Sequence, residues 1–142
     1  MALAAPFALD LMLLIILGMS EHEVQSTFVK LVSDQHPEIL YCATVGGARM
    51  RISEAKKIKK QGYRRGIPDI LFYEPRSGSY GLAIEVKKEK GGRTSPFQIQ
   101  WRDDLLKRGY QSVICKGLDE CIHAFNLYFG VKLQSAPPKG PR

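Results

Sequence analysis

The sequence predicts a single α/β domain in which a small mixed sheet is flanked by helices. Three observations indicate this class: a length of 142 residues, helical and strand-like patterns that alternate along the chain, and two apolar strands joined by a short turn. A chain of this length can bury one hydrophobic core. The hydrophobic share of 44% and the charged share of 25% are typical of a globular domain. We expect the element order αβββαβ, followed by a C-terminal helix.

The first helix is predicted to begin after Ser20. Ser20 and Glu23 have the spacing of a capping box, in which each side chain accepts a hydrogen bond from the other residue's backbone N–H. The apolar stripe of this helix follows at helical spacing and consists of Val24, Phe28, Leu31 and Val32. Pro37 is expected to end the helix.

Three strands are predicted in the middle of the chain. The first covers residues 39–45 and leads into Gly46-Gly47, and a basic segment over residues 53–61 is expected to be helical. Residues 70–73 and 80–87 are predicted to be strands because they are apolar and flank the turn-rich segment 75–79. This spacing favours an antiparallel hairpin.

A second long helix is predicted to begin at Ser95-Pro96, a cap followed by proline at the first helical position. Its apolar stripe is predicted to consist of Phe97, Trp101 and Leu105, with Trp101 in the core rather than stacked on a base. Gly109 suits the end of this helix.

One more strand and one more helix complete the expected order. Residues 111–115 are apolar enough for a buried strand, and residues 121–129 are predicted to be a helix capped by Asp119.

The three cysteines show no paired spacing. This argues against a disulfide framework and against a structural zinc site. Cys42 and Cys115 lie in apolar runs, so we expect them to be small core residues. The pattern favours a reducing, cytoplasmic setting.

Both ends of the chain differ from the middle. Residues 1–19 are almost wholly apolar but include Asp10 and lack the features of a signal peptide. We interpret them as an extension, such as an upstream start codon would add, and assign them no function. Residues 131–142 are expected to be a disordered basic tail. The folded domain is predicted to cover residues 20–130.

The chain is basic, with 21 Lys and Arg residues against 14 Asp and Glu, a formal net charge of +7. Between positions 49 and 65 the basic residues are Arg49, Arg51, Lys56, Lys57, Lys59, Lys60, Arg64 and Arg65, opposed only by Glu54. Such a run is compatible with a solvated helix face. Because it leads directly into an acidic motif, we favour a surface that contacts a polyanion such as DNA.

That acidic motif consists of Asp69, Glu85 and Lys87. Side chains alternate between the two faces of a strand, so Ala83, Glu85 and Lys87 should share one face. A hairpin turn near Ser77-Gly78 would place Asp69 opposite the segment 85–87. Two carboxylates would then lie within reach of one magnesium ion, which prefers hard oxygen ligands. This arrangement suits metal-assisted hydrolysis of a phosphodiester.

Each of these residues also has a purely structural explanation. Asp69 could be a turn residue after proline. Glu85 and Lys87 could form an ion pair on an edge strand. Their joint occurrence favours the site.

Over residues 20–130 the chain resembles a stand-alone VRR-NUC domain of phage or bacterial type, a branch of the PD-(D/E)xK nucleases with a restriction-endonuclease-like core. The motifs that carry the resemblance are Glu21-His22-Glu23-Val24-Gln25, Gly46-Gly47, Gly62-Tyr63-Arg64-Arg65-Gly66-Ile67-Pro68-Asp69, Glu85-Val86-Lys87-Lys88, Ser95-Pro96-Phe97-Gln98 and Gly109-Tyr110.

The resemblance implies roles for the motif residues. Asp69 and Glu85 would bind the metal, the Val86 backbone carbonyl would be a third ligand, and Lys87 would be the catalytic cation. Gln98 would be a further catalytic residue near Lys87, although its capping box with Ser95 could explain it fully.

The first-helix acid of the family has two candidates in this chain. Glu23 has a capping role, whereas Glu21 falls beside the apolar stripe, where an inward-facing acid needs a partner such as a metal. We therefore choose Glu21 as catalytic residue and metal ligand. Gln25, on the same side of the helix, is expected to support the site or contact DNA.

The resemblance implies a Mg²⁺- or Mn²⁺-dependent endodeoxyribonuclease that acts as a homodimer on branched or four-way junction DNA. We expect no membrane partner and no further cofactor. Two alternatives stay open, namely a non-catalytic DNA-binding module on the same fold and a restriction-type duplex endonuclease. The residues expected to contact DNA are Gln25, Arg49, Arg51, Lys56, Lys57, Lys60, Arg64, Arg65, Lys88, Lys90 and Arg93. For the last three, a solvated loop is the structural alternative.

Overall fold

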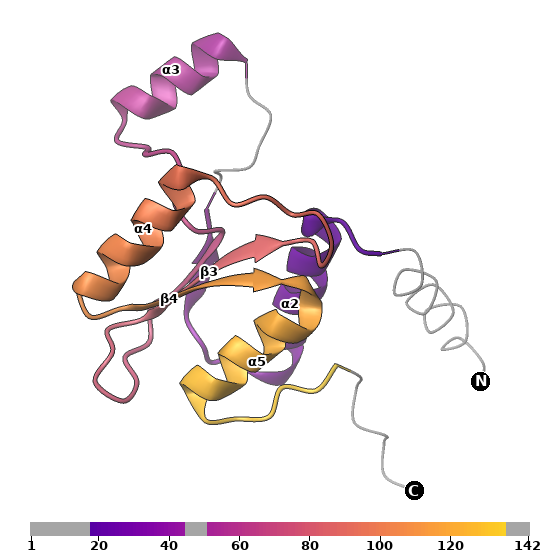
Figure 1. Cartoon of the computed structure of the whole chain (residues 1–142). Coiled ribbons are helices and arrows are strands. Elements are labelled where there is room, and N and C mark those ends of the chain that lie inside the picture. Colours follow the sequence, from indigo (N-terminus) through magenta and orange to yellow (C-terminus); the bar gives the residue numbers. More distant parts are fainter. Residues whose placement is uncertain (1–17, 45–50, 136–142) are drawn as a thin grey trace, which may run out of the picture.

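The computed structural model describes residues 18–44 and 51–135 and contains a four-stranded mixed sheet (Figure 1). The strands lie in the spatial order β1 (Tyr41–Ala43), β2 (Ile70–Phe72), β3 (Leu82–Lys87) and β4 (Gln111–Lys116). β2 pairs antiparallel with β1 and with β3, and β4 runs parallel to β3. The predicted α/β class is confirmed.

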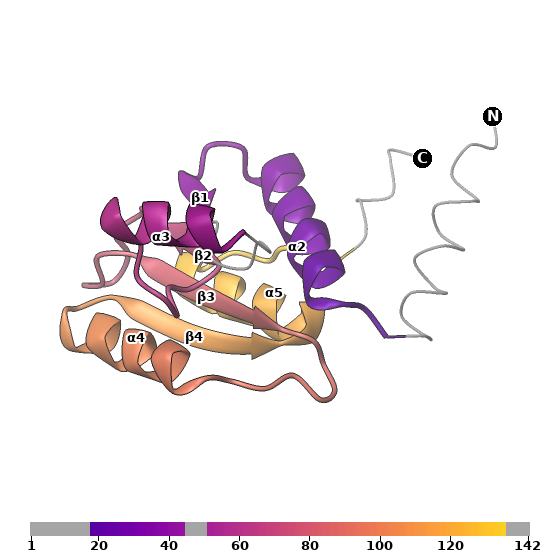
Figure 2. The ribbon, with the colours of Figure 1, turned by 90° about the horizontal axis from the view of Figure 1, so that it is seen from above.

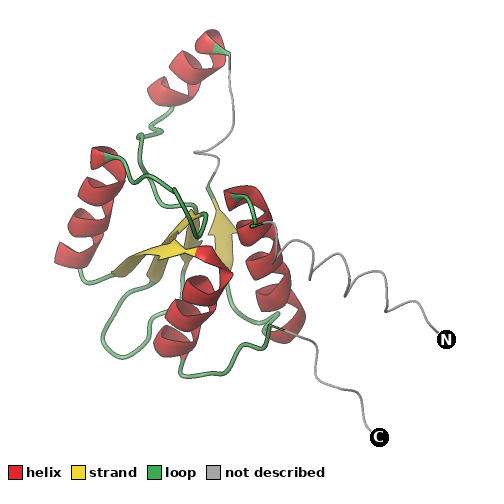
Figure 3. Ribbon diagram, turned by 45° about the vertical axis from the view of Figure 1, so that its right-hand side comes forward, coloured by secondary structure: helices red, strands yellow, loops and turns green. Residues whose placement is uncertain are grey.

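Helices cover both faces of the sheet (Figures 2 and 3). α2 (Glu21–Gln35) and α5 (Gly117–Phe129) contact each other and β3 on one face. α4 (Pro96–Lys107) packs along β4 on the other face. α3 (Ile52–Lys60) stands away from the sheet in Figure 1, and none of its residues is buried.

The hydrophobic core lies between the sheet and the pair α2 and α5. Three phenylalanine rings meet there edge to face: Phe28 of α2 lies 6.2 Å from Phe72 of β2 and 6.0 Å from Phe125 of α5, measured between ring centroids. Ile84 and Val86 of β3 are buried beneath them. These large apolar groups fix the position of β3 because core packing tolerates little displacement.

β3 is a central strand, and every one of its residues is buried. Ala83, Glu85 and Lys87 share one face, as predicted, and most of this face is covered. Glu85 and Lys87 each expose only 5% of their surface. The alternative that places them on an edge strand is therefore wrong, since β4 pairs with β3 along its whole length.

Both predicted capping boxes are present. The Ser20 N–H donates to Glu23 Oε2 at 2.8 Å, and the Glu23 N–H donates to Ser20 Oγ at 3.2 Å. Ser95 and Gln98 repeat this pattern at the start of α4. α2 ends at Gln35, shortly before the predicted stop.

Two core predictions are wrong, namely that for Cys42 and that for the apolar stripe of α4. Cys42 is exposed because β1 is an edge strand, whereas Cys115 is buried as expected. No residue of α4 is buried, and Phe97 is 50% exposed. The sheet face beneath the start of α4 carries polar groups, so the helix has no apolar core to cover there. Trp101 is half-buried and donates Nε1–H to the Arg65 carbonyl at 3.0 Å.

Several predicted boundaries also change. β1 covers Tyr41–Ala43 rather than residues 39–45, and β3 begins at Leu82 rather than at residue 80. α5 begins at Gly117, so Asp119 lies in its first turn and does not cap it. The ordered domain continues beyond residue 130, since Leu133 is buried and its N–H donates to Asn126 Oδ1 at 2.6 Å. Residues 131–135 are therefore not part of a disordered tail.

Some predictions fall outside the described residues. These concern residues 1–17 and 136–142, the Gly46-Gly47 pair and Arg49. Within residues 18–44 and 51–135, no helix is both long and apolar enough to cross a membrane.

Candidate active site

The β2–β3 hairpin brings Asp69 to the carboxyl end of β3. Ile70 pairs with Ile84, so Asp69, one residue earlier, comes to lie beside the end of the strand. Its Oδ2 accepts the Val86 N–H at 2.7 Å. The predicted juxtaposition of Asp69 with the segment 85–87 is thus what the structure shows.

The loop that carries Asp69 is anchored by the end of β1. Thr44 Oγ1 donates to the Pro68 carbonyl at 2.7 Å, and the Thr44 N–H donates to the Asp69 carbonyl at 2.8 Å. These two bonds hold the backbone on both sides of the Pro68–Asp69 peptide. No motif in the sequence indicates this anchor.

Gly66 lets the same loop approach α4. Its φ is +89°, and a Cβ atom there would lie 2.6 Å from the carbonyl carbon of Phe97. Only glycine fits such a conformation and such a close backbone contact.

Glu85, Lys87 and Gln98 form one connected group. Lys87 Nζ lies 3.1 Å from Glu85 Oε1, and Gln98 Nε2 donates a hydrogen bond to the same oxygen. Gln98 also closes the capping box with Ser95. The two explanations considered for Gln98 are therefore both realised by one side chain.

Burial changes the pKa of the two carboxyl groups at this site. Burial, together with the nearby charge of Asp69, raises the pKa of Glu85 to about 7, although Lys87 acts in the opposite direction. Burial also raises the pKa of Asp69, against the lowering effect of the Val86 N–H and of Lys87. Two carboxylates that resist simultaneous ionisation create a place where a divalent cation is stabilising.

The raised pKa of Glu85 predicts a pH-dependent stability of the metal-free protein. The folded state binds this proton more tightly than the unfolded chain, whose ordinary pKa is 4.5. The free energy of unfolding should therefore fall as pH rises from about 4.5 to about 7 and level off above that range. Glu85→Gln, which cannot ionise, should flatten this part of the curve. Urea denaturation in EDTA between pH 4 and 8 measures it, and identical curves for both proteins would contradict the raised pKa.

The group opens into a cleft of about 330 Å³. Seven predicted site residues line it, namely Glu21, Arg65, Asp69, Glu85, Lys87, Arg93 and Gln98. Tyr63, Gly66, Ile67 and Ser95 complete the lining. Glu23 remains in its capping box, so of the two first-helix candidates Glu21 is the one that faces the cleft. Tyr63 was not predicted, although it lies within a quoted motif.

The other predicted DNA contacts lie outside the cleft. Lys56, Lys57 and Lys60 are exposed on α3, and Arg51 precedes that helix. Arg64 lies with its guanidinium 5.2 Å from the centre of the Trp101 ring. Lys88 and Lys90 are exposed directly after β3, and Gln25 is half-buried on α2.

The donor groups suit a magnesium-type ion with few protein ligands. Asp69 bonds the protein through Oδ2 and Glu85 through Oε1, and within the described ranges no hydrogen bond or ion pair occupies their second oxygens. The Val86 N–H points toward Asp69, and in a strand the carbonyl of a residue points to the same side as its N–H. Magnesium commonly takes one or two carboxylates and completes its shell with water and phosphate.

Glu21 does not complete a three-acid cluster. In the described part of the chain, no three carboxylate, histidine or cysteine side chains lie close enough to hold one ion. Glu21 lies at the rim, near enough for its charge to act on Asp69 and Glu85. Its role as a direct ligand stays a prediction.

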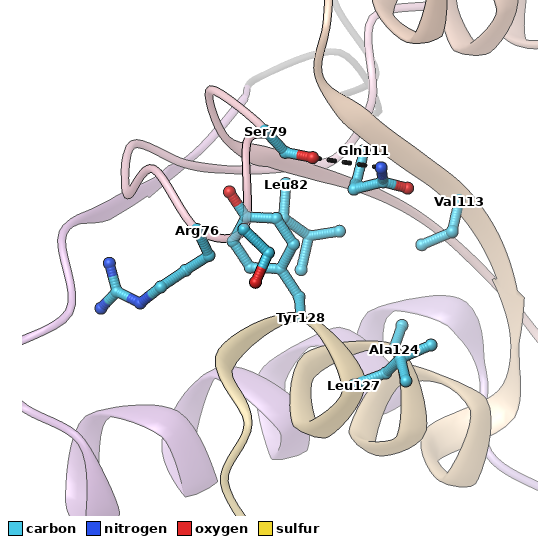
Figure 4. Close-up of a pocket in the computed structure, with 9 residues that line it drawn as sticks. Arg76, Ser79, Leu82, Gln111, Val113, Ala124, Leu127 and Tyr128 are labelled. Carbon is cyan, nitrogen blue, oxygen red and sulfur yellow. Dashed lines mark hydrogen bonds between the residues drawn. The ribbon is translucent and has the colours of Figure 1, made fainter.

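A second hollow of about 250 Å³ lies on the α5 face, between the β2–β3 turn and α5 (Figure 4). Two of its polar side chains are bonded within the protein: Gln111 donates to Ser79 at 3.2 Å, and Tyr128 donates to the Glu74 carbonyl at 2.6 Å. Its lining has no residue in common with that of the cleft, and we assign it no chemistry.

Comparisons with known proteins identify a family and a fold. The model of the VRR-NUC domain family matches residues 16–119. A solved structure described as a VRR_NUC domain protein superposes with a TM-score of 0.68 at 28% sequence identity, covering 81% of this chain and 92% of the other. No curated protein matches the sequence.

The fold and the family match together define an α/β domain of a nuclease-type family. The chain belongs to the VRR-NUC domain family, whose model matches most of its length.

Proposed function

We propose that this protein is a divalent-metal-dependent endodeoxyribonuclease that hydrolyses phosphodiester bonds. One observation carries the proposal: Asp69 and Glu85 lie in one cleft beside Lys87, each with one oxygen bonded to the protein and one without a partner in the described structure. The two carboxylates suit a metal ion, and the neighbouring lysine suits the phosphate that the metal would also bind.

Each residue has a distinct task in this proposal. Asp69, Glu85 and the Val86 carbonyl would hold Mg²⁺ or Mn²⁺, with Glu21 at the rim as a further ligand. The metal would supply charge stabilisation and lower the pKa of a bound water. Gln98 holds Glu85 by its amide, so it orients the carboxylate. Lys87 lies where it can orient the attacking water and offset charge on the phosphate.

The basic surface around the cleft would bind the DNA backbone. α3 has Lys56, Lys57 and Lys60 exposed, and Lys88 and Lys90 follow β3 on the site's own loop. Because phosphate contacts release counterions, binding should weaken steeply with salt. Residues 18–44 and 51–135 contain no element typical of base reading, so selection by DNA structure is favoured over selection by sequence.

We further propose that the substrate is branched DNA and that the enzyme works as a homodimer. Two copies related by a two-fold axis would present two clefts, which suits a four-way junction with two scissile strands. The catalytic unit is proposed to begin near Ser20.

The test is a cleavage assay on four-way, flap and linear DNA of matched sequence. Magnesium, manganese and EDTA are compared, and sedimentation gives the oligomeric state. We expect cleavage with either metal, none in EDTA, and a preference for the four-way junction.

Other results would correct the proposal in defined ways. Binding without cleavage under every metal would favour a non-catalytic DNA-binding module. Discrete products from linear duplex, without preference for branches, would favour a restriction-type enzyme. Undiminished cleavage in EDTA would refute metal dependence.

A further inference from the structure

Arg65 is held at the rim of the cleft by the first turn of α4. Its guanidinium carbon lies 4.8 Å from the centre of the Phe97 ring, and the residue lines the cleft together with Asp69 and Glu85. A guanidinium above a phenyl face is stabilised by the charge distribution of the ring. The contact therefore fixes the direction of a side chain that would otherwise be free to rotate.

The main chain at Arg65 is fixed by the same helix. The Arg65 carbonyl accepts the Trp101 Nε1–H at 3.0 Å. The next residue, Gly66, lies against the Phe97 backbone so closely that a Cβ would be 2.7 Å from the Phe97 carbonyl oxygen. α4 thus contacts both the backbone and the side chain of Arg65. The N–H edge of the guanidinium stays available to bind a ligand.

That edge has no acidic partner. Within the described residues, no carboxylate lies within ion-pair distance of Arg65, whereas Lys87 is committed to Glu85 at 3.1 Å. Stacking occupies the face of a guanidinium and leaves its N–H edge, which matches a phosphate by two parallel hydrogen bonds. Arg65 is therefore a pre-organised anion ligand. The cleft lining also contains Lys87, which is paired with Glu85, and Arg93, for which the described structure shows no stacking on a ring.

The exposure of Phe97 supports the same view. It is 50% exposed on a helix that buries none of its residues, so core packing does not explain this ring. The contact of the Phe97 ring with the Arg65 guanidinium does explain its position.

Building on the proposed nuclease function, we propose that Arg65 binds the phosphate that is cleaved and that Phe97 is the positioning residue that holds it there. This separates Arg65 from the lysines of α3, which lie outside the cleft and would add affinity only. A charge-assisted pair formed at the reacting phosphate stabilises the transition state.

The test is a double-mutant cycle of Arg65→Ala and Phe97→Leu, in which kcat is measured on the DNA substrate that the wild-type protein cleaves. At saturating DNA, Arg65→Ala should lower kcat by about ten- to a hundredfold, the effect of losing one charge-assisted contact. Phe97→Leu should lower kcat in the same direction, and the double variant should be no slower than Arg65→Ala. Phe97→Tyr keeps the ring face and should restore kcat. Multiplying effects in the double variant, or no restoration by tyrosine, would overturn the role of Phe97.

The salt dependence of DNA binding in EDTA separates a phosphate contact from a structural effect. Arg65→Ala should reduce the slope of log K against log salt by about one, whereas Phe97→Leu keeps the charge and should leave the slope unchanged. Arg108→Ala removes an arginine at the far end of α4 and serves as the matched control, with kcat expected to equal that of the wild type. Thermal melting confirms that each variant is folded.

The outcomes of the two proposals can be told apart. If the wild-type protein binds DNA but does not cleave it with metal, the nuclease proposal is wrong. The salt dependence of DNA binding by Arg65→Ala would then still test whether Arg65 contacts a phosphate. An unchanged slope, or an unchanged kcat in an active enzyme, would overturn the assignment of Arg65.

Discussion

Replacing Lys87 with methionine is expected to lower the single-turnover cleavage rate by about a thousandfold, the scale seen when one charge-stabilising group leaves an active site. Lys87 is the buried cation beside Glu85, and methionine keeps much of its volume without the charge. Loss of the ammonium removes what we propose to be the group that orients water and offsets phosphate charge. Rates measured with excess enzyme and saturating Mg²⁺ report the step directly.

Lys116→Met is the matched control for this variant. Lys116 occupies the position on β4 that pairs with Lys87 on β3, but it is exposed and lies outside the cleft. Its cleavage rate should stay within about twofold of the wild type, as is usual for a surface change away from a site. A Lys87→Met enzyme as fast as Lys116→Met would remove Lys87 from the mechanism.

Asp69→Asn is expected to have a comparably large effect on cleavage, about a thousandfold, because a ligand charge for the metal is lost. The amide oxygen can still accept the Val86 N–H, so the loop should stay in place. The metal-free protein should be at least as stable as the wild type, since the charge that opposes ionisation of Glu85 is gone. Cleavage across a magnesium titration and urea denaturation in EDTA measure the two effects.

The matched control is Asp119→Asn, an exposed aspartate in the first turn of α5. It should leave the magnesium titration unchanged. If Asp69→Asn lost both activity and stability, the aspartate would be a structural residue and the metal assignment would fall.

The hairpin at the centre of the site was predictable because it depends on local rules. Alternation along residues 80–87 placed Glu85 and Lys87 on one face, and a turn near Ser77-Gly78 set the register that brings Asp69 to Val86. Gln98 was predictable only in part. Its capping role follows from its spacing to Ser95, whereas its bond to Glu85 depends on where α4 lies against the sheet.

Predictions based on apolar patterns failed where burial depends on neighbours distant in sequence. Phe97 and Trp101 have helical spacing, but α4 covers a polar part of the sheet, so they pack against Arg65 and Arg64 instead of entering a core. Cys42 lies in an apolar run and is nevertheless exposed, since nothing in the run shows that β1 is an edge strand.

The sequence by itself determined the class of the fold, the two capped helices and the acid–lysine set, because each depends on residue types at short, fixed spacing. The helical pattern favoured Glu21 over Glu23, and the structure places Glu21 in the lining of the cleft. Only the tertiary structure decided that Tyr63 also lines the cleft and that Thr44 anchors the loop of Asp69. The tertiary structure also decided that the Arg65 guanidinium lies over the Phe97 ring. These facts depend on how helices and strands far apart in the chain pack, and the free energy of that packing is shared by many residues, so no short motif records it.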